Sequence, residues 1–151
     1  MVNFLIQLSK NQIFMAVLVA WFIAQCAKVF LGIVTERKFN FRWFVDTGGM
    51  PSSHAATVSA LATAVCIKYG VTSSIFAVTL VFAWIIMMDA QGFRRSVGKQ
   101  AETLNVILDD IYWKKVVKEE KLRELLGHTP VEVLIGTAIG VLVAIIFMEI
   151  S

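Results

Sequence analysis

The sequence predicts an all-α fold, a polytopic membrane bundle of four transmembrane helices with an amphipathic helical arm. The first observation is composition: a chain of 151 residues that is 58% hydrophobic, with a mean hydropathy of +0.74, is too apolar for an ordinary soluble domain. The second is that apolar residues form stretches long enough to cross a bilayer. The third is that eleven of the fourteen Lys and Arg residues fall in two segments, 35–50 and 91–128. We therefore expect one membrane-embedded domain over residues 1–151.

The element boundaries follow from local signals. Residues 1–10 form an interfacial lead-in, in which apolar side chains surround Asn, Gln and Lys. Gly70 ends the second apolar stretch, and Thr129 and Pro130 are expected to cap and begin the last. The predicted spans cover residues 13–34, 52–69, 72–89 and 131–150.

Small residues recur every four positions in two of these spans, which allows two helix backbones to approach closely. The two series are Ala56, Ala60 and Ala64, and Gly136, Gly140 and Ala144. Cys26 and Cys66 also lie inside apolar spans, with neither pairing nor metal-ligand spacing, so we predict packed thiols rather than a disulfide.

The distribution of charge predicts an orientation. Four spans place the two basic segments on one side of the membrane and both termini on the other, and the positive-inside rule assigns the basic side to the cytoplasm. Such clustering is typical of membrane orientation and of an anionic ligand, not of nucleic-acid binding. On this side, residues 91–127 are predicted to form an amphipathic arm in water or at the interface. The polar residues expected near this face include His54, Asp89, Arg94, Arg95, His128 and Glu132.

The turn at residues 48–54, Gly-Gly-Met-Pro-Ser-Ser-His, opens a helix of small residues. It can present backbone N–H groups, the hydroxyls of Ser52 and Ser53 and the ring of His54 at one helix N-terminus. This is a natural anion site. A helix cap is the structural alternative for the two serines.

The chain has only two histidines, and both sit at predicted helix starts. His128 and Glu132 are four residues apart and can share a helix face. A carboxylate that accepts a hydrogen bond from one ring nitrogen leaves the other nitrogen free to act as a nucleophile. His54 can then protonate the leaving oxygen.

Three cations are candidates to hold phosphate oxygens: Arg94, Arg95 and Lys28. Each has a structural alternative, since an Arg pair after a span is typical of the positive-inside signal and Lys28 can snorkel to the interface. Which of the two arginines faces the site stays open. Two histidines, a carboxylate and three cations on one membrane face nevertheless favour an anion-processing site.

Three segments resemble the divergent branch of the type 2 phosphatidic acid phosphatases, which is related to the vanadium-dependent haloperoxidases and comprises small bacterial and plastid membrane proteins. The resemblance covers about residues 10–150. The matching segments are 48–56 (Gly-Gly-Met-Pro-Ser-Ser-His-Ala-Ala), 89–105 (Asp-Ala-Gln-Gly-Phe-Arg-Arg-Ser-Val-Gly-Lys-Gln-Ala-Glu-Thr-Leu-Asn) and 124–133 (Glu-Leu-Leu-Gly-His-Thr-Pro-Val-Glu-Val).

The resemblance implies a role for each matching residue. His128 resembles the nucleophile, Glu132 its orienting carboxylate and His54 the general acid. The implied phosphate-binding residues are Arg95, Arg94, Ser52, Ser53, Lys28 and Arg37, with Asp89, Gln25, Gln100 and Asn105 as supporting polar residues. The implied mechanism passes through a phosphohistidine and needs no metal or other cofactor.

The chain departs from the wider superfamily at several positions. Ser53 stands where glycine is usual, and Glu132 stands where aspartate is usual. Arg95 precedes His128 by more than thirty residues, where the superfamily has only a handful. Four spans are also fewer than the lipid phosphatases have, so either this minimal core suffices or a homodimer completes the site.

The resulting expectation is a membrane phosphatase that hydrolyses a lipid-linked phosphate monoester. The substrate would be phosphatidic acid, phosphatidylglycerophosphate or a polyprenyl phosphate, with its tail in the bilayer and its head at His128. Two alternatives remain: a non-catalytic protein that binds or transports a lipid phosphate, and a structural membrane subunit that docks through its arm.

Overall fold

The computed structural model describes residues 2–37, 49–91, 100–105 and 128–150, and all of the regular structure in these ranges is helical. Most of the predicted arm, including the two arginines at 94 and 95, therefore lies outside the described residues, and only the 100–105 part of it is seen as helix. The named helices are α1 (Val2–Ser9), α2 (Gln12–Glu36), α3 (Ser53–Tyr69), α4 (Ser74–Gln91) and α6 (Pro130–Ile150).

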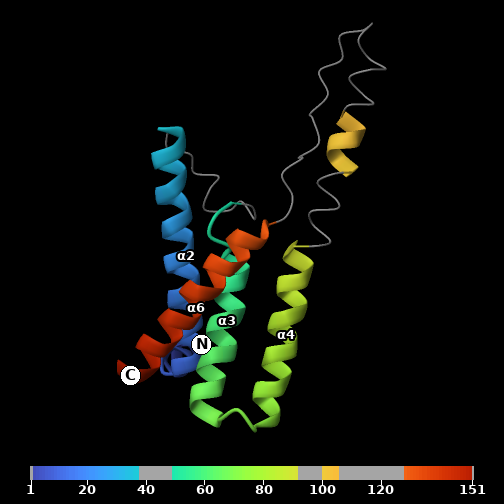
Figure 1. Ribbon diagram of the computed structural model, residues 1–151. Coiled ribbons are helices and arrows are strands. Elements are labelled where there is room, and N and C mark those ends of the chain that lie inside the picture. The colour runs from blue at the N-terminus through green and yellow to red at the C-terminus, as the bar shows by residue number, and fades with distance from the viewer. Residues whose placement is uncertain (1, 38–48, 92–99, 106–127, 151) are drawn as a thin grey trace, which may run out of the picture.

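Helix α3 is the centre of the bundle. It packs against α2, α4 and α6, whereas α2 and α4 do not contact each other in the described part of the chain (Figure 1). Both termini and the turn between α3 and α4 lie at one end of the bundle, and the starts of α3 and α6 lie at the other (Figure 1). This is the arrangement that the order of the spans predicts.

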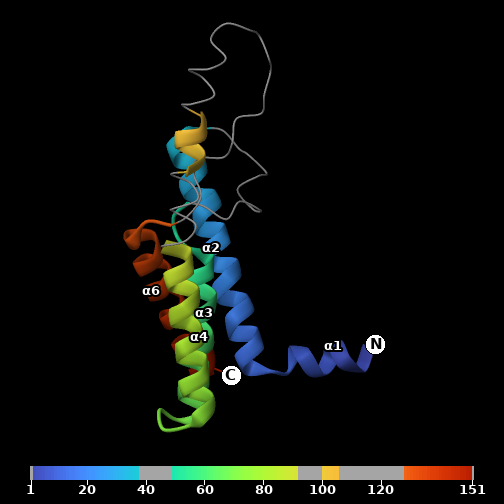
Figure 2. The ribbon, with the colours of Figure 1, turned by 90° about the vertical axis from the view of Figure 1, so that its right-hand side faces the viewer.

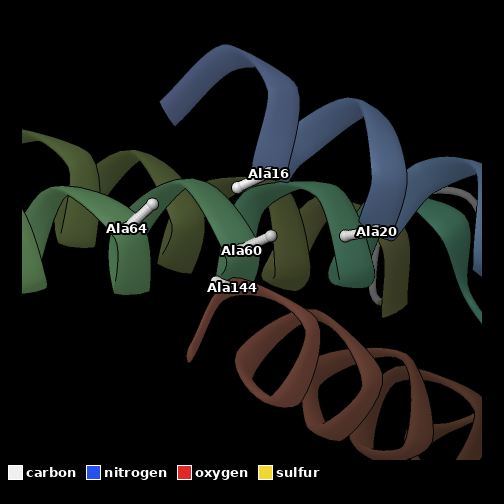
Figure 3. Packing of buried hydrophobic residues seen from close by; sticks show 5 residues of the cluster. All are labelled: Ala16, Ala20, Ala60, Ala64 and Ala144. Atoms are coloured by element: carbon white, nitrogen blue, oxygen red, sulfur yellow. The ribbon is translucent and has the colours of Figure 1, made fainter. Parts of the chain in front are cut away.

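Alanines and glycines make the close packing possible. A fully buried alanine cluster joins α2, α3 and α6 (Figure 3), and its members are Ala16, Ala20, Ala60, Ala64 and Ala144. On α6, a Cβ added at Gly136 would collide with the Ser52 carbonyl oxygen, and one added at Gly140 would collide with the Ser59 hydroxyl and the Ala56 carbonyl. The predicted close-packing faces of α3 and α6 are therefore confirmed, and they face each other.

Within the described ranges, three helices are long and apolar enough to cross a membrane, over Gln12–Thr35, Ser74–Gln91 and Pro130–Ile150. The fourth predicted span forms α3, which has 17 residues and is thus about 26 Å long at the usual rise per residue. Its composition is less apolar than that of the others because it carries serine, threonine and histidine. The predicted helix exists, but it is shorter and more enclosed than the other three.

The helix starts follow the predicted local chemistry. Asn11 caps α2 by accepting a hydrogen bond from the Phe14 N–H at 3.2 Å, and Ser52 caps α3. Pro130 is the first residue of α6, as predicted, because its missing N–H costs nothing there. Gly70, with φ of +82°, ends α3.

The predicted interfacial lead-in forms α1, which turns sharply away from the axis of α2 (Figure 2). Its Phe4, Leu5 and Ile6 side chains are exposed. The prediction that both cysteines are packed is wrong for Cys26, which is exposed, while Cys66 is half-buried; both are free thiols. Cys26 follows the buried Ala24 by two residues and so lies on the other side of α2.

Candidate functional site

The first turns of α3 and α6 are joined at one end of the bundle. The Ser52 N–H donates to the Glu132 carbonyl at 3.0 Å, and Gly136 packs directly against the Ser52 carbonyl. Two helix N-termini thus share one location, and both dipoles favour a negative charge there.

Ser52 acts as a structural cap. Its hydroxyl accepts a hydrogen bond from the Ala55 N–H at 3.3 Å, and the residue is completely buried. Because its own N–H is bound to Glu132, the N–H groups that α3 can offer to an anion belong to the residues that follow it. Ser53 is buried beside it, and His54 is half-buried in the same first turn.

His128 is held from both its backbone and its ring. Its N–H donates to the carbonyl of Ala90, at the end of α4, at 3.0 Å. Its ring Nδ1 lies 3.3 Å from Oε2 of Glu132, and only 1% of the residue is exposed. The sequence predicted the Glu132 contact from the spacing of four residues, but it carried no signal for the Ala90 contact, which involves only backbone atoms.

The Glu132 carboxylate is itself fixed by the cap of α6. Its Oε2 accepts a hydrogen bond from the Thr129 N–H at 2.9 Å, and the Thr129 hydroxyl accepts one from the Glu132 N–H at 3.3 Å. This reciprocal pair is a capping box, which satisfies two N–H groups at the helix start. The carboxylate that contacts His128 therefore cannot turn away without opening the cap.

The two histidine rings meet. The ring centroids of His54 and His128 are 5.9 Å apart, and the rings are tilted by 56°. One comes from the first turn of α3 and the other from the residue before the cap of α6, so the junction of these two helices brings them together. They are close enough for one phosphate group to contact both.

Lys28 approaches the site from α2. It is 95% buried, so it does not snorkel to the interface, and Gln25 is buried one turn before it. A Cβ added at Gly49 would lie 3.8 Å from both Cγ and Cδ of Lys28, so the lysine stem runs along the turn that leads into α3. Gly49 has φ of +94°, a conformation that favours glycine. A cation beside the turn into α3 adds to the positive potential at the N-terminus of that helix.

The other predicted site residues are spread more widely. Asp89 is exposed in the last turn of α4, next to the Ala90 that anchors His128. Arg37 is exposed and caps the end of α2 through its backbone, so it is not buried with Lys28. In the short helix at 100–105, Asn105 is buried and Gln100 is exposed. In the described ranges, no cluster of three or more His, Cys, Asp or Glu residues could hold a metal ion.

Fold and site together define a class of protein: a helical membrane protein with a pair of buried or half-buried histidines, backed by a carboxylate, at one end of its bundle. A model of the Divergent PAP2 family matches residues 9–143. The chain belongs to this family. It is also 40% identical, over 151 residues that cover 93% of this chain and 96% of the relative, to the uncharacterized membrane protein YuiD of Bacillus subtilis (strain 168). No solved structure matches the chain.

Proposed function

We propose that this protein is a membrane phosphatase that hydrolyses a lipid-linked phosphate monoester through a phosphohistidine at His128. The observation that carries the proposal is the histidine pair, with ring centroids 5.9 Å apart, together with Glu132 behind one ring at 3.3 Å. Membership of the Divergent PAP2 family supports it. In this proposal His128 is the nucleophile, Glu132 orients its ring, and His54 is the general acid.

The position of Glu132 indicates which ring nitrogen of His128 is the nucleophile. An ionised carboxylate can only accept hydrogen bonds, so it favours the tautomer of His128 that carries its proton on Nδ1. The lone pair is then on Nε2, which attacks phosphorus while the bond from phosphorus to the lipid oxygen breaks. His54, protonated, gives its proton to that leaving oxygen and releases the lipid alcohol.

The second half of the reaction regenerates the enzyme. Neutral His54 takes a proton from water, the water oxygen bonds to phosphorus, and the bond from phosphorus to Nε2 breaks. Inorganic phosphate leaves, and His54 is again protonated. The same residue thus serves first as acid and then as base.

Cations and helix N-termini stabilise the negative charge of the transferred phosphoryl group in this proposal. Lys28 and the N-terminal N–H groups of α3 contact the phosphate oxygens in this proposal, which is electrostatic stabilisation of the transition state. Arg94 and Arg95, with their bidentate donors, complete the set from the arm.

The membrane orientation belongs to the same proposal. We take α3 as a fourth crossing, which puts the histidines at the cytoplasmic face where most Lys and Arg residues lie. The phosphate head of phosphatidic acid, phosphatidylglycerophosphate or a polyprenyl phosphate then reaches the site while its tail stays in the bilayer.

Two alanine variants test the division of roles. His128→Ala should abolish phosphate release from all substrates, by about a thousandfold or more, because the nucleophile is gone. His54→Ala should lose most turnover of a lipid phosphate. With a nitrophenyl phosphate, whose leaving group needs no protonation, it should still release a burst of nitrophenolate, after which hydrolysis of the phosphohistidine, which also uses His54, limits turnover. The measurements are phosphate release in detergent micelles and trapping of a labelled, acid-labile phosphoenzyme.

Lys68→Ala, on the exposed far end of α3, is the matched control and should behave as wild type. Full turnover in His128→Ala would remove the mechanism. Binding of phosphate or vanadate to the wild type, with no release from any lipid phosphate, would instead identify a non-catalytic binding protein.

A further inference from the structure

The first turns of α3 are partly exposed along one narrow strip. From residue 51 to residue 62 every residue is buried except three, His54, Thr57 and Leu61, which are half-buried. Their spacing of three and four residues puts them on one face of the helix. We call this face the α3 strip.

The neighbours of α3 define the borders of the strip. On one side, Ala60 packs in the cluster with Ala16 and Ala20 of α2. On the other, Val58 and Ala62 pack against Ala83 of α4. Helix α6 covers the opposite face through its two glycines. Because α2 and α4 do not touch each other, the strip lies open between them.

The strip changes in character from its polar end to its apolar end. It begins at His54, whose ring meets His128. The Thr57 hydroxyl donates to the Ser53 carbonyl of its own helix at 2.7 Å, so the hydrogen-bonding capacity of this half-buried side chain is satisfied within α3. Leu61 continues the apolar surface, about 10 Å along the helix from His54.

We infer that the strip binds the apolar chain of the substrate. A single acyl or prenyl chain lies between α2 and α4, over Thr57 and Leu61, and the phosphate group of the same lipid lies at the histidine pair. The inference rests on the proposed function and specifies how its substrate is held. The occupant is a lipid because α2 and α4 are both apolar enough to span a membrane. The particular lipid is one with a phosphate monoester because the strip runs continuously into the candidate phosphate site.

Bulky substitutions on the strip test the inference, because they should affect substrates with a long apolar chain more than substrates with a short one. Leu61→Trp and Thr57→Trp should lower turnover of a long-chain lipid phosphate by about tenfold or more, while turnover of a water-soluble short-chain phosphate changes by less than about twofold. Leu142→Trp, a matched change on an exposed position of α6, should affect neither substrate. An equal loss with both substrates, or no loss with either, would overturn the inference.

A second measurement does not depend on turnover. The wild-type protein is placed in vesicles with a photoreactive phosphatidic acid or with a phosphatidylcholine that carries the same photoreactive chain, and the labelled residues are mapped by mass spectrometry. Labelling of Thr57 and Leu61 should be several-fold stronger with the monoester, and labelling of Leu142 should be equal. Equal labelling of the strip by the two lipids would show that the strip is not a binding site for the substrate chain, whether or not phosphate release is found. Preferential labelling by the monoester without phosphate release would support the binding site and contradict only the proposed hydrolysis.

Discussion

At the scale of single residues, Glu132 links the stability of a helix to the chemistry of a histidine. Its side chain forms the cap of α6 with Thr129 and contacts His128. Its backbone carbonyl accepts a hydrogen bond from the Ser52 N–H. One residue therefore joins the starts of α3 and α6 through its backbone carbonyl and positions His128 through its carboxylate. A shorter acid at this position would change the reach of the carboxylate towards His128 and the Thr129 N–H.

Glu132→Gln separates the chemical role from the cap. Because Oε2 meets both the Thr129 N–H and His128 Nδ1, an amide oxygen in its place can still accept from both, but the neutral amide no longer stabilises the positive charge that develops on the His128 ring as Nε2 attacks. We expect kcat to fall by about 10²–10³-fold, the usual effect of removing one electrostatic contact to charge that develops in the transition state, with an unchanged unfolding temperature. Phosphate-release kinetics and thermal unfolding in detergent measure the two effects.

Glu149→Gln, near the exposed end of the same helix, is the control and should leave both quantities unchanged. If Glu132→Gln lowers the unfolding temperature and leaves kcat intact, the carboxylate is only a cap.

At the scale of elements, the contact between α3 and α6 decides the geometry of the site. The two helices approach so closely that Gly136 and Gly140 have no room for a Cβ. Ser59 strengthens this contact, since its hydroxyl lies 3.2 Å from the Thr137 carbonyl of α6. Because His54 and His128 sit at the starts of these helices, any separation of the pair also separates the rings.

Gly140→Ala tests this coupling. The added methyl group meets the Ser59 hydroxyl and the Ala56 carbonyl, and because the second of these is backbone, the helices must move apart, at a cost of about 1–3 kcal/mol. We expect a lower midpoint in denaturant titration and weaker vanadate binding. Ala138→Leu, a larger change at an exposed position of α6, should alter neither; an unchanged midpoint for Gly140→Ala would show that the helices can relax at no cost.

At the scale of the whole molecule, the order of the helices places the starts of α3 and α6 at one end of the bundle and both termini at the other. Both termini and the turn between α3 and α4 are at the end opposite the histidines (Figure 1). If α3 crosses the membrane, as we propose, Met50 and Thr72, which lie just beyond its two ends, are on opposite sides. This makes α3 the element on which the assignment of sidedness depends.

Single cysteines at these two positions test the crossing. In a background with Cys26 and Cys66 replaced, Thr72→Cys should react with a membrane-impermeant maleimide in intact cells, and Met50→Cys only after the membrane is opened. Both positions are exposed in the fold. The positive-inside distribution gives the expected direction. Reaction of both cysteines from the same side would mean that α3 does not cross, and reaction with the two sides exchanged would place the histidines outside the cell.

The four long helices of the described ranges, their ends to within about two residues and the family were predictable from the sequence, because each depends on residues that are near one another in the chain. Apolar stretches define spans, and Ser52, Gly70, Thr129 and Pro130 act on the turn of helix that each one borders. Spacing also predicted the contact of His128 with Glu132, which are only four residues apart.

Only the tertiary structure decided which distant residues meet. The sequence predicted that the two histidines meet at one face, but the distance and tilt of their rings depend on how the helices pack around α3. The burial of Lys28 against Gly49, the anchoring of His128 on Ala90 and the open strip between α2 and α4 have the same origin. The exposure of Cys26 has the same origin, since hydropathy marks a residue as membrane-embedded without saying whether it faces protein or lipid. The free energy of helix packing comes from many small contacts between residues that are far apart in the chain. A local sequence pattern therefore does not predict it.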